Sequence, residues 1–196
     1  MLAYLLSDRG LLNSIRTETD PTVSDNNVDL ERLMNHCPRL ESVFYETLRL
    51  TGASSSVRRV IAPTEIGGKV LRSGHRVIIP YRQLHLNKDV YGMDVNEFDP
   101  DRFLKNRNLN HHPSYRPFGG GANYCPGRFI ARQEVNVFVA LLLSRFEIDI
   151  LPEKGRRDGE RTAARLPVMD HGKPCLGVLR PKRGEDIILS VRERTV

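Results

Sequence analysis

One of the three cysteines of this 196-residue chain lies in a stretch that could control the reactivity of a thiol. Residues 118–127 read FGGGANYCPG, so Cys125 follows three glycines and precedes a Pro-Gly pair. Glycines allow backbone conformations that other residues rarely adopt, and they leave space for a bulky group to approach the chain. We expect Cys125 at the start of a helix, where free N–H groups and the helix dipole stabilise a thiolate. Pro126 fits the first turn of that helix, because its missing N–H would have no partner there.

A thiolate in such a loop could act as a nucleophile or as an axial metal ligand. A nucleophile requires an activating base, and the sequence places none of the six histidines beside Cys125. A lone cysteine is otherwise most often a buried and inert side chain. A phosphate-binding loop is disfavoured, because the Lys-Ser/Thr of a P-loop is missing. The residues of the loop by themselves leave nucleophile, ligand and inert thiol open.

A charged pair and two adjacent histidines are further candidates. Glu46 and Arg49 would lie about 60° apart on a predicted helix, opposite its apolar face, and such pairs are usually solvated contacts of about 0.2–0.5 kcal/mol. His111 and His112 lie in a polar segment without a third ligand at suitable spacing, so we expect them to be exposed. His85 is expected to pack near the end of a strand.

The elements that position these residues begin with helices. Residues 2–19 predict two short helices separated by Asp-Arg-Gly at 8–10, and Asp29 predicts the cap of a short helix that ends near His36. Pro38 fits the first turn of the next helix. Its apolar face would consist of Leu40, Val43, Phe44, Thr47 and Leu48.

The rest of the chain alternates short strands, loops and one long helix. Residues 57–84 predict two or three antiparallel strands, with turns at two Gly-containing pairs, and 86–117 predict a long irregular loop. The helix at 128–146 is apolar on nearly all sides in its second half and is therefore expected to be buried. EIDIL at 147–151 predicts a strand, and 174–192 predict a closing hairpin that turns at Lys182-Arg183-Gly184. The predicted fold class is mainly α with a minor antiparallel β component (α+β).

Composition excludes several classes of protein. The net charge is +6, but basic and acidic residues are interleaved and no nucleic-acid motif accompanies them, so we expect no nucleic-acid partner. The longest apolar run, VFVALLL, is far shorter than the roughly 18 residues that a membrane span needs, and the first residues do not predict a signal peptide. Cys37 and Cys175 indicate ordinary thiols, and the odd, widely spaced cysteines favour a reducing compartment.

The segment FGGGANYCPGRFIARQE resembles the haem-binding loop of the cytochrome P450 superfamily, whose pattern is Phe-x-x-Gly-x-x-x-Cys-x-Gly-x-x-x-Ala-x-x-Glu. The positions in register are Phe118, Gly121, Cys125, Gly127, Ala131 and Glu134. Two further motifs follow the family's order. They are Glu46-Thr-Leu-Arg49 and the segment FDPDRF, whose Arg102 the resemblance places in a buried, structural network with that pair.

The resemblance implies a role for each residue of the loop. Cys125 would be the thiolate ligand of the iron of haem b, Phe118 would pack beside it, and Gly121, Gly127 and Ala131 would allow close approach. Arg58 is the candidate partner of a haem propionate. Arg59 is the neighbour with which it could be confused, because strand alternation turns one of the two inward. Asn123 stands where the family often has Arg or His, so that propionate contact is expected to be weaker or differently made.

The resemblance also implies an activity and partners. The activity would be haem-thiolate monooxygenation of a small apolar substrate. The turn LTGASSSVRRV, in place of a more usual Pro-rich one, resembles that of sterol hydroxylases and prostacyclin synthase, which favours a lipid or sterol-like compound. The electron donor would be a flavoprotein reductase or a ferredoxin-type protein. It would meet a basic surface formed by Lys105, Arg107, Arg128 and Arg132, which could equally be a solvated surface without a partner.

Residues 1–196 would form one partial cytochrome P450 domain, equivalent to the C-terminal, haem-binding part. The family's distal helix, with the acid-alcohol pair that activates oxygen, would lie upstream of residue 1, so no catalytic residue is assigned. The alternative is a truncated, non-catalytic haem-binding fragment. The expected location is the endoplasmic reticulum membrane by resemblance, with no spanning segment in this chain, and otherwise the cytoplasm.

Overall fold

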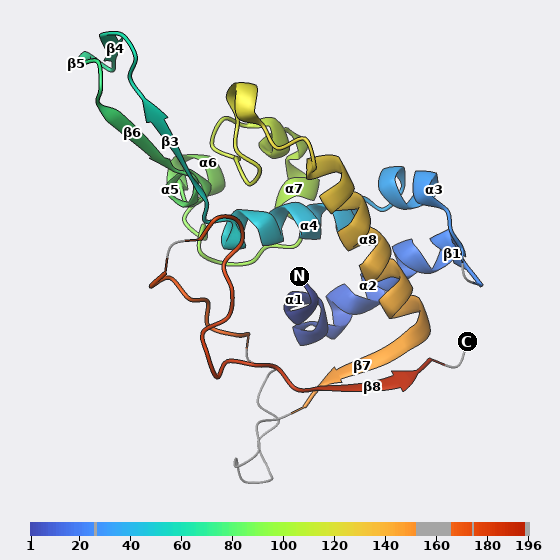
Figure 1. Cartoon of the computed structure of the whole chain (residues 1–196). Helices are drawn as coiled ribbons and strands as arrows, with labels where there is room; N and C mark the ends of the chain where they lie inside the picture. Colours follow the sequence, from blue (N-terminus) through green and yellow to red (C-terminus); the bar gives the residue numbers. More distant parts are fainter. Residues whose placement is uncertain (26, 152–165, 174, 195–196) are drawn as a thin grey trace.

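The structure is a computed structural model that describes residues 1–25, 27–151, 166–173 and 175–194, except for the side chain of Asn123. Helices and 3-10 turns dominate (Figure 1). The helices are α1 (Leu2–Ser7), α2 (Arg9–Thr19), α3 (Leu30–Asn35), α4 (Pro38–Thr51), α5 (Tyr81–His85), α6 (Lys88–Tyr91), α7 (Arg102–Lys105) and α8 (Arg128–Arg145). The 3-10 turns are η1 (Asp20–Thr22), η2 (Arg107–His111) and η3 (Gly121–Asn123).

The strands pair antiparallel in small two-stranded sheets. The pairs are β1 (Val23–Ser24) with β2 (Asn27–Val28), β3 (Ser55–Arg59) with β6 (Arg76–Pro80), β4 (Thr64–Ile66) with β5 (Lys69–Leu71), and β7 (Phe146–Ile150) with β8 (Leu189–Glu193). This arrangement confirms the predicted class, mainly α with a minor antiparallel β component. No helix within the described ranges is long and apolar enough to cross a membrane.

Local capping explains where the first helices begin. Asp8 separates α1 from α2 and caps α2, because its side chain accepts a hydrogen bond from the Leu11 amide at 3.0 Å. Asp29 caps α3 in the same way. Pro38 is the first residue of α4, whose free amides are capped from a distance by the carboxylate of Glu18. The predicted starts at Asp29 and Pro38 are therefore confirmed, whereas the break between the first two helices is Asp8 alone, because Arg9 and Gly10 belong to α2.

The main core lies where α1, α2, α4, α8 and β7 meet. Its fully buried members include Leu5, Leu12, Ile15, Leu40, Val43, Ala140 and Leu143. A second cluster of Tyr91, Val95, Phe103, Leu109 and Tyr115 fills the region between α4 and α7. The second cluster includes Tyr115, which lies three residues before the segment 118–127.

The strands after α4 form a projecting hairpin. β3 pairs with β6, and the chain between them folds into the short β4–β5 pair at the tip (Figure 1). Gly67 and Gly68 make the turn with φ of 57° and 74°, a conformation that suits glycine. The predicted antiparallel strands and their turn are present, although residues 81–85 form α5 instead of continuing the last strand.

Three sequence expectations are wrong. The segment 86–117 is not a continuous irregular loop, because α6, α7 and η2 lie within it. The closing segment turns at 182–184, but β8 pairs with β7 and not with the residues that precede the turn. The helix α8 is not buried on all sides, since Phe129, Ile130 and Phe138 are 65%, 60% and 56% exposed. In this chain one face of α8 contacts the core.

Candidate functional site

The segment 118–127, called the Cys loop below, is closed by its own backbone. The Cys125 amide donates to the Phe118 carbonyl at 3.1 Å, and the Tyr124 amide donates to the Gly121 carbonyl at 3.2 Å. Gly119 and Gly121 have φ of 83° and 66°, in the left-handed region. The loop needs glycine at these two positions, because other residues adopt that conformation at a cost.

Cys125 presents its thiol at the surface of the chain. The side chain is free and exposed, in contrast to the buried Cys37. Exposure contradicts the alternative of a buried and inert thiol. Within the described residues no hydrogen bond joins this thiol to a histidine, so the activated nucleophile gains no support.

The position of Cys125 relative to α8 differs slightly from the prediction. The helix begins at Arg128 with Gly127 as its cap, so Pro126 precedes the helix and is not in its first turn. Pro126 and Gly127 separate Cys125 from Arg128, the first residue of the helix, and a Cβ on Gly127 would lie 3.8 Å from the Cys125 sulfur. This is an ordinary van der Waals distance, so the close approach of the Gly127 backbone stays a prediction. Ala131 lies in the first turn, where its amide donates to the Gly127 carbonyl at 2.9 Å.

Arg128 fastens the end of the Cys loop. Its guanidinium donates to the Cys125 carbonyl at 3.0 Å. The same group lies 4.2 Å from the centre of the Tyr124 ring and 4.1 Å from that of Phe129. Such contacts between a cation and an aromatic ring are favourable by about 0.5–1 kcal/mol at exposed sites. From the sequence we predict Arg128 only as part of a basic surface for an electron donor, and neither its hydrogen bond to Cys125 nor its aromatic contacts are predicted.

The charged pair on α4 is fully buried. Arg49 donates to both carboxylate oxygens of Glu46 at 2.7 Å, and Arg102 donates to Oε1 of Glu46 at 3.1 Å. Glu46 and Arg49 have no exposed side-chain surface. The solvated contact that spacing alone suggests is therefore wrong, and the structural network that the resemblance predicts is confirmed.

The two arginines also hold the chain that follows α5. Arg49 donates to the carbonyls of His85 at 3.1 Å and Val95 at 2.6 Å. Arg102 donates to the Asp94 carboxylate at 2.8 Å, and this hydrogen bond lowers the pKa of Asp94. Backbone carbonyls thus satisfy the remaining donors, which is the condition for a stable buried ion network.

The other predicted residues are distributed around the Cys loop. Phe118 and Gly121 lie in it, whereas the side chain of Asn123 lies outside the part of the chain that the structure describes. Arg58 and Arg59 are both exposed, so the expectation that one turns inward is wrong. They still point to opposite faces of the β3–β6 hairpin, but this two-stranded hairpin projects from the body of the chain.

The remaining polar candidates have ordinary partners. The ring of His112 accepts a hydrogen bond from the Ser114 amide at 3.1 Å, and His111 is exposed as expected. Two cations of the predicted basic surface are already paired, Lys105 with Asp99 and Arg132 with Glu41. Within the described ranges no group of three or more His, Cys, Asp or Glu side chains could hold a metal ion.

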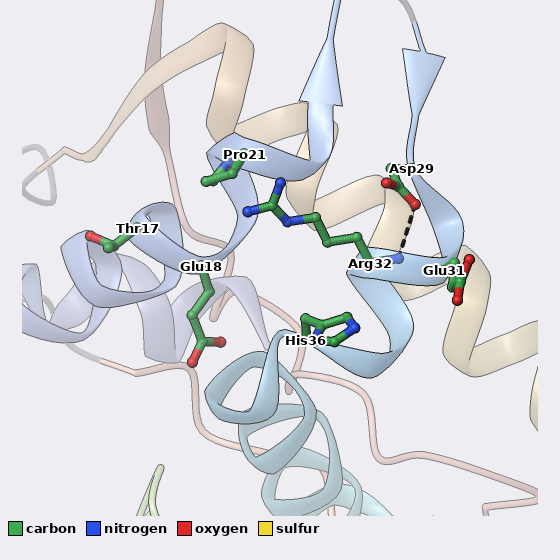
Figure 2. A pocket seen from close by; sticks show the side chains of 7 residues that line it. All are labelled: Thr17, Glu18, Pro21, Asp29, Glu31, Arg32 and His36. Atoms are coloured by element: carbon green, nitrogen blue, oxygen red, sulfur yellow. Dashed lines mark hydrogen bonds between the residues drawn. The ribbon is translucent and has the colours of Figure 1, made fainter.

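A cavity of about 430 Å³ lies apart from the Cys loop, between α2, η1 and α3 (Figure 2). Its lining residues are Thr17, Glu18, Pro21, Asp29, Glu31, Arg32 and His36. Two of its carboxylates are already used as helix caps, Glu18 for α4 and Asp29 for α3. The cavity is therefore part of a junction between helices, and none of the sequence motifs extends into it.

Comparison with known proteins identifies the family to which the chain belongs. The family model described as cytochrome P450 matches residues 1–171. The chain belongs to the cytochrome P450 family. "Cytochrome P450 714B3" of Zea mays is 34% identical over 141 residues, which are 71% of this chain and 26% of that protein. "Bifunctional cytochrome P450/NADPH–P450 reductase ALT2" of Alternaria alternata is 33% identical over 148 residues, or 74% of this chain and 13% of that protein.

A solved P450 shares the fold. The structure described as "Retinoic acid bound cyanobacterial CYP120A1" superposes with a TM-score of 0.72 and 25% identity, over 97% of this chain and 42% of that one. This P450 chain thus spans about a quarter of the length of the maize relative and less than half of the cyanobacterial one. The match extends well beyond the Cys loop, to the α4 network and the β3–β6 hairpin.

Proposed function

We propose that this P450 chain binds haem b through Cys125 and forms the haem-binding part of a haem-thiolate monooxygenase, which inserts one atom of O₂ into an apolar organic substrate. The observation that carries the proposal is the exposed Cys125 thiol in a closed glycine loop that precedes α8. Membership of the P450 family supports it. Because the relatives are much longer, the activity is proposed for the protein to which this part belongs.

The residues present fit a haem in three respects. A single exposed thiol suits a metal that brings its other ligands with it, as haem iron does. A Cβ at Gly121 would meet no atom within 4 Å, which leaves space on that side of the loop. The buried Glu46–Arg49–Arg102 network fixes the scaffold from which the loop extends.

Each residue would then have a definite task. Cys125 would ligate the iron, and Phe118 would pack beside the ligand. Gly121, Gly127 and Ala131, which have small or no side chains, would allow the haem to approach the backbone closely. Arg58, whose guanidinium is exposed, would pair with a haem propionate. We assign Asn123 the weaker contact with a propionate that the resemblance predicts.

When bound, the haem would supply reductive activation of O₂, which an electron-rich thiolate ligand promotes. This chain's own contribution is to hold the sulfur of Cys125 in place. Two hydrogen bonds hold the backbone of Cys125: its amide donates to the Phe118 carbonyl, and its carbonyl accepts from the Arg128 guanidinium.

A small apolar substrate of the lipid or sterol type and a reductase-type donor complete the proposal. The cyanobacterial structure is described as binding retinoic acid, an apolar carboxylic acid, and the Alternaria relative as a fusion with NADPH–P450 reductase. A flavoprotein donor is therefore proposed first, and a ferredoxin-type donor second. By family resemblance we also propose association with the endoplasmic reticulum membrane, which fractionation of expressing cells would test.

The first experiment is the absorption spectrum of the purified chain with haemin, reduced by dithionite under carbon monoxide. A strongly red-shifted Soret band is expected, and Cys125→Ala should abolish it. Cys175→Ala is the matched control, because Cys175 is the other cysteine with accessible surface, and it should keep the band. An unshifted band, or one indifferent to Cys125→Ala, would refute ligation by this residue.

Turnover needs a separate measurement. The haem-loaded chain is incubated with retinoic acid as an apolar probe, NADPH and a P450 reductase, and oxygenated product is sought by mass spectrometry. Product that disappears in Cys125→Ala supports the monooxygenase. A thiolate-type spectrum without product, tested also with a fatty acid and a sterol, supports the alternative of a non-catalytic haem-binding fragment.

A further inference from the structure

His85 is a buried residue that the loop chemistry does not explain. It ends α5, and its side chain has no exposed surface. Both ring nitrogens have partners in different parts of the chain. Nδ1 lies 3.3 Å from the Gly52 carbonyl, just after α4, and Nε2 lies 2.9 Å from the Arg116 amide, just before the Cys loop.

These partners fix the state of the ring. The Arg116 amide can only donate, so Nε2 must accept and carry no proton. The proton is then on Nδ1, which donates to the Gly52 carbonyl. A neutral ring is also favoured by burial and by the nearby cations Arg49 and Arg82, which lower the pKa of His85 to about 4.

The same residue is tied to the buried ion network through its backbone. Arg49 of that network donates to the His85 carbonyl at 3.1 Å. The ring of His85 also contacts the ring of Tyr115, with centres 5.8 Å apart, and the Tyr115 hydroxyl donates to the Tyr45 carbonyl on α4. His85 is therefore held from two sides, by an arginine of α4 and by the second apolar cluster.

A short series of bonds leads from this ring to Cys125. The Arg116 amide is held by His85, and the Arg116 carbonyl accepts from the Gly119 amide at 3.2 Å. Between them the chain passes Phe118, whose carbonyl accepts from the Cys125 amide at 3.1 Å. The bonds among Arg116, Gly119 and Cys125 are internal to one segment. The bond from His85 joins the first part of that segment to the scaffold, and Arg128 of α8 holds its other end at the Cys125 carbonyl.

We propose that His85 is a positioning residue for the Cys loop, in which a neutral imidazole links the end of α4 to the Arg116 amide and so sets where Cys125 lies. Imidazole suits the task because it offers one donor and one acceptor on opposite sides of a rigid ring. The part of the inference that concerns haem rests on the proposed function, whereas the link itself does not.

Two substitutions separate the two bonds of the ring. Asn places an amide near Nδ1, so His85→Asn keeps a donor for Gly52 and loses the acceptor for Arg116. Gln reaches further, so His85→Gln restores an acceptor near Nε2. Amide hydrogen exchange of the haem-free chain is the readout. We expect exchange at Arg116, Gly119 and Cys125 to rise about tenfold or more in the Asn variant and to return toward the wild-type rate in the Gln variant.

Amides of α8 near Val139 report global stability and serve as the internal control. Exchange that rises equally in the Cys loop and in α8, in both variants, would show a merely structural role and overturn the proposal. If His85→Asn fails to fold, the ¹⁵N shifts of the wild-type His85 ring at pH 7 decide instead. A ring protonated on Nδ1 alone supports the proposal, and a ring protonated on Nε2 refutes it.

The haem-loaded chain gives the functional readout. His85→Asn should lower the fraction of the red-shifted carbon monoxide band at equal total haem, and His85→Gln should recover it. An unchanged fraction in His85→Asn would mean that the ring does not position Cys125. If the wild-type chain shows no such band, the proposed function fails, and the exchange experiment still decides the role of His85.

Discussion

Replacing Glu46 with Gln should destabilise this P450 chain far more than any neutralisation at its surface. The Glu46 carboxylate accepts from Arg49 twice, from Arg102 and from the Asp99 amide, at 2.7–3.2 Å. A neutral glutamine amide in its place would leave the buried Arg49 guanidinium without an anion, whereas Arg102 would keep the Asp94 carboxylate. Removal of one partner from a buried ion network costs about 3–5 kcal/mol.

Urea unfolding followed by circular dichroism measures this loss. With a slope of about 2 kcal/mol/M, a loss of about 3–5 kcal/mol lowers the midpoint by about 1.5–2.5 M. Glu41→Gln on the same helix is the matched control. Its partner Arg132 is 24% exposed and Glu41 itself 35%, so the expected loss is below about 1 kcal/mol. Equal midpoints for Glu46→Gln and Glu41→Gln would refute the argument that burial makes this network costly to break.

Three further outcomes follow from the geometry. Gly121→Ala should lower Tm by several degrees, because a φ of 66° costs a residue with a side chain about 1–2 kcal/mol even though no atom would lie within 4 Å of the added Cβ. Gly177→Ala is the control and should leave Tm unchanged, because its Cβ would also meet no atom within 4 Å and its φ is not positive. The pKa of His85 falls from 6.5 to about 4 on folding, so between these pH values the unfolded chain binds more protons than the folded chain. The free energy of unfolding should therefore decrease by about 3 kcal/mol as the pH falls from above about 6.5 to 4. Denaturant midpoints measured for His85→Asn should lack this pH dependence. Iodoacetamide at about pH 8 should label the exposed Cys125 of the haem-free chain much faster than Cys37, because burial raises the pKa of the Cys37 thiol to about 11. Equal labelling rates of the two cysteines in mass spectrometry would contradict the expected difference in reactivity.

Features with local causes could be predicted from the sequence. Asp8 and Asp29 mark helix starts because each accepts a hydrogen bond from an amide three residues further on. Pro38 marks one because its missing N–H would have no partner in a first turn. Gly67 and Gly68 mark a turn because their own φ values are positive. The functional loop also has a local signature, since its glycines and Cys125 lie within one segment.

Features that depend on distant partners could not be predicted from spacing. Glu46 and Arg49 look like a surface pair until Arg102 and the carbonyls after α5 enclose them. The partners of His85 lie 33 and 31 residues away, and nothing near it in the sequence indicates either one. Likewise β8 pairs with β7 across the whole closing segment. In these cases tertiary contacts determined the outcome, and local pattern carried no signal.

The buried network and the Cys loop should therefore respond to the same mutation, although no residue of the network touches Cys125. Tyr124, which precedes Cys125 in the sequence, is 40% exposed, so burial of its ring contributes little to fixing the loop. Hydrogen bonds hold the segment at both ends, from His85 at the Arg116 amide and from Arg128 of α8 at the Cys125 carbonyl. Since Arg49 holds the His85 carbonyl, Glu46→Gln should loosen His85 as well. We expect faster exchange at the Arg116 amide in that variant than its global loss of stability accounts for, and exchange that tracks global stability alone would show that the network and the loop are independent.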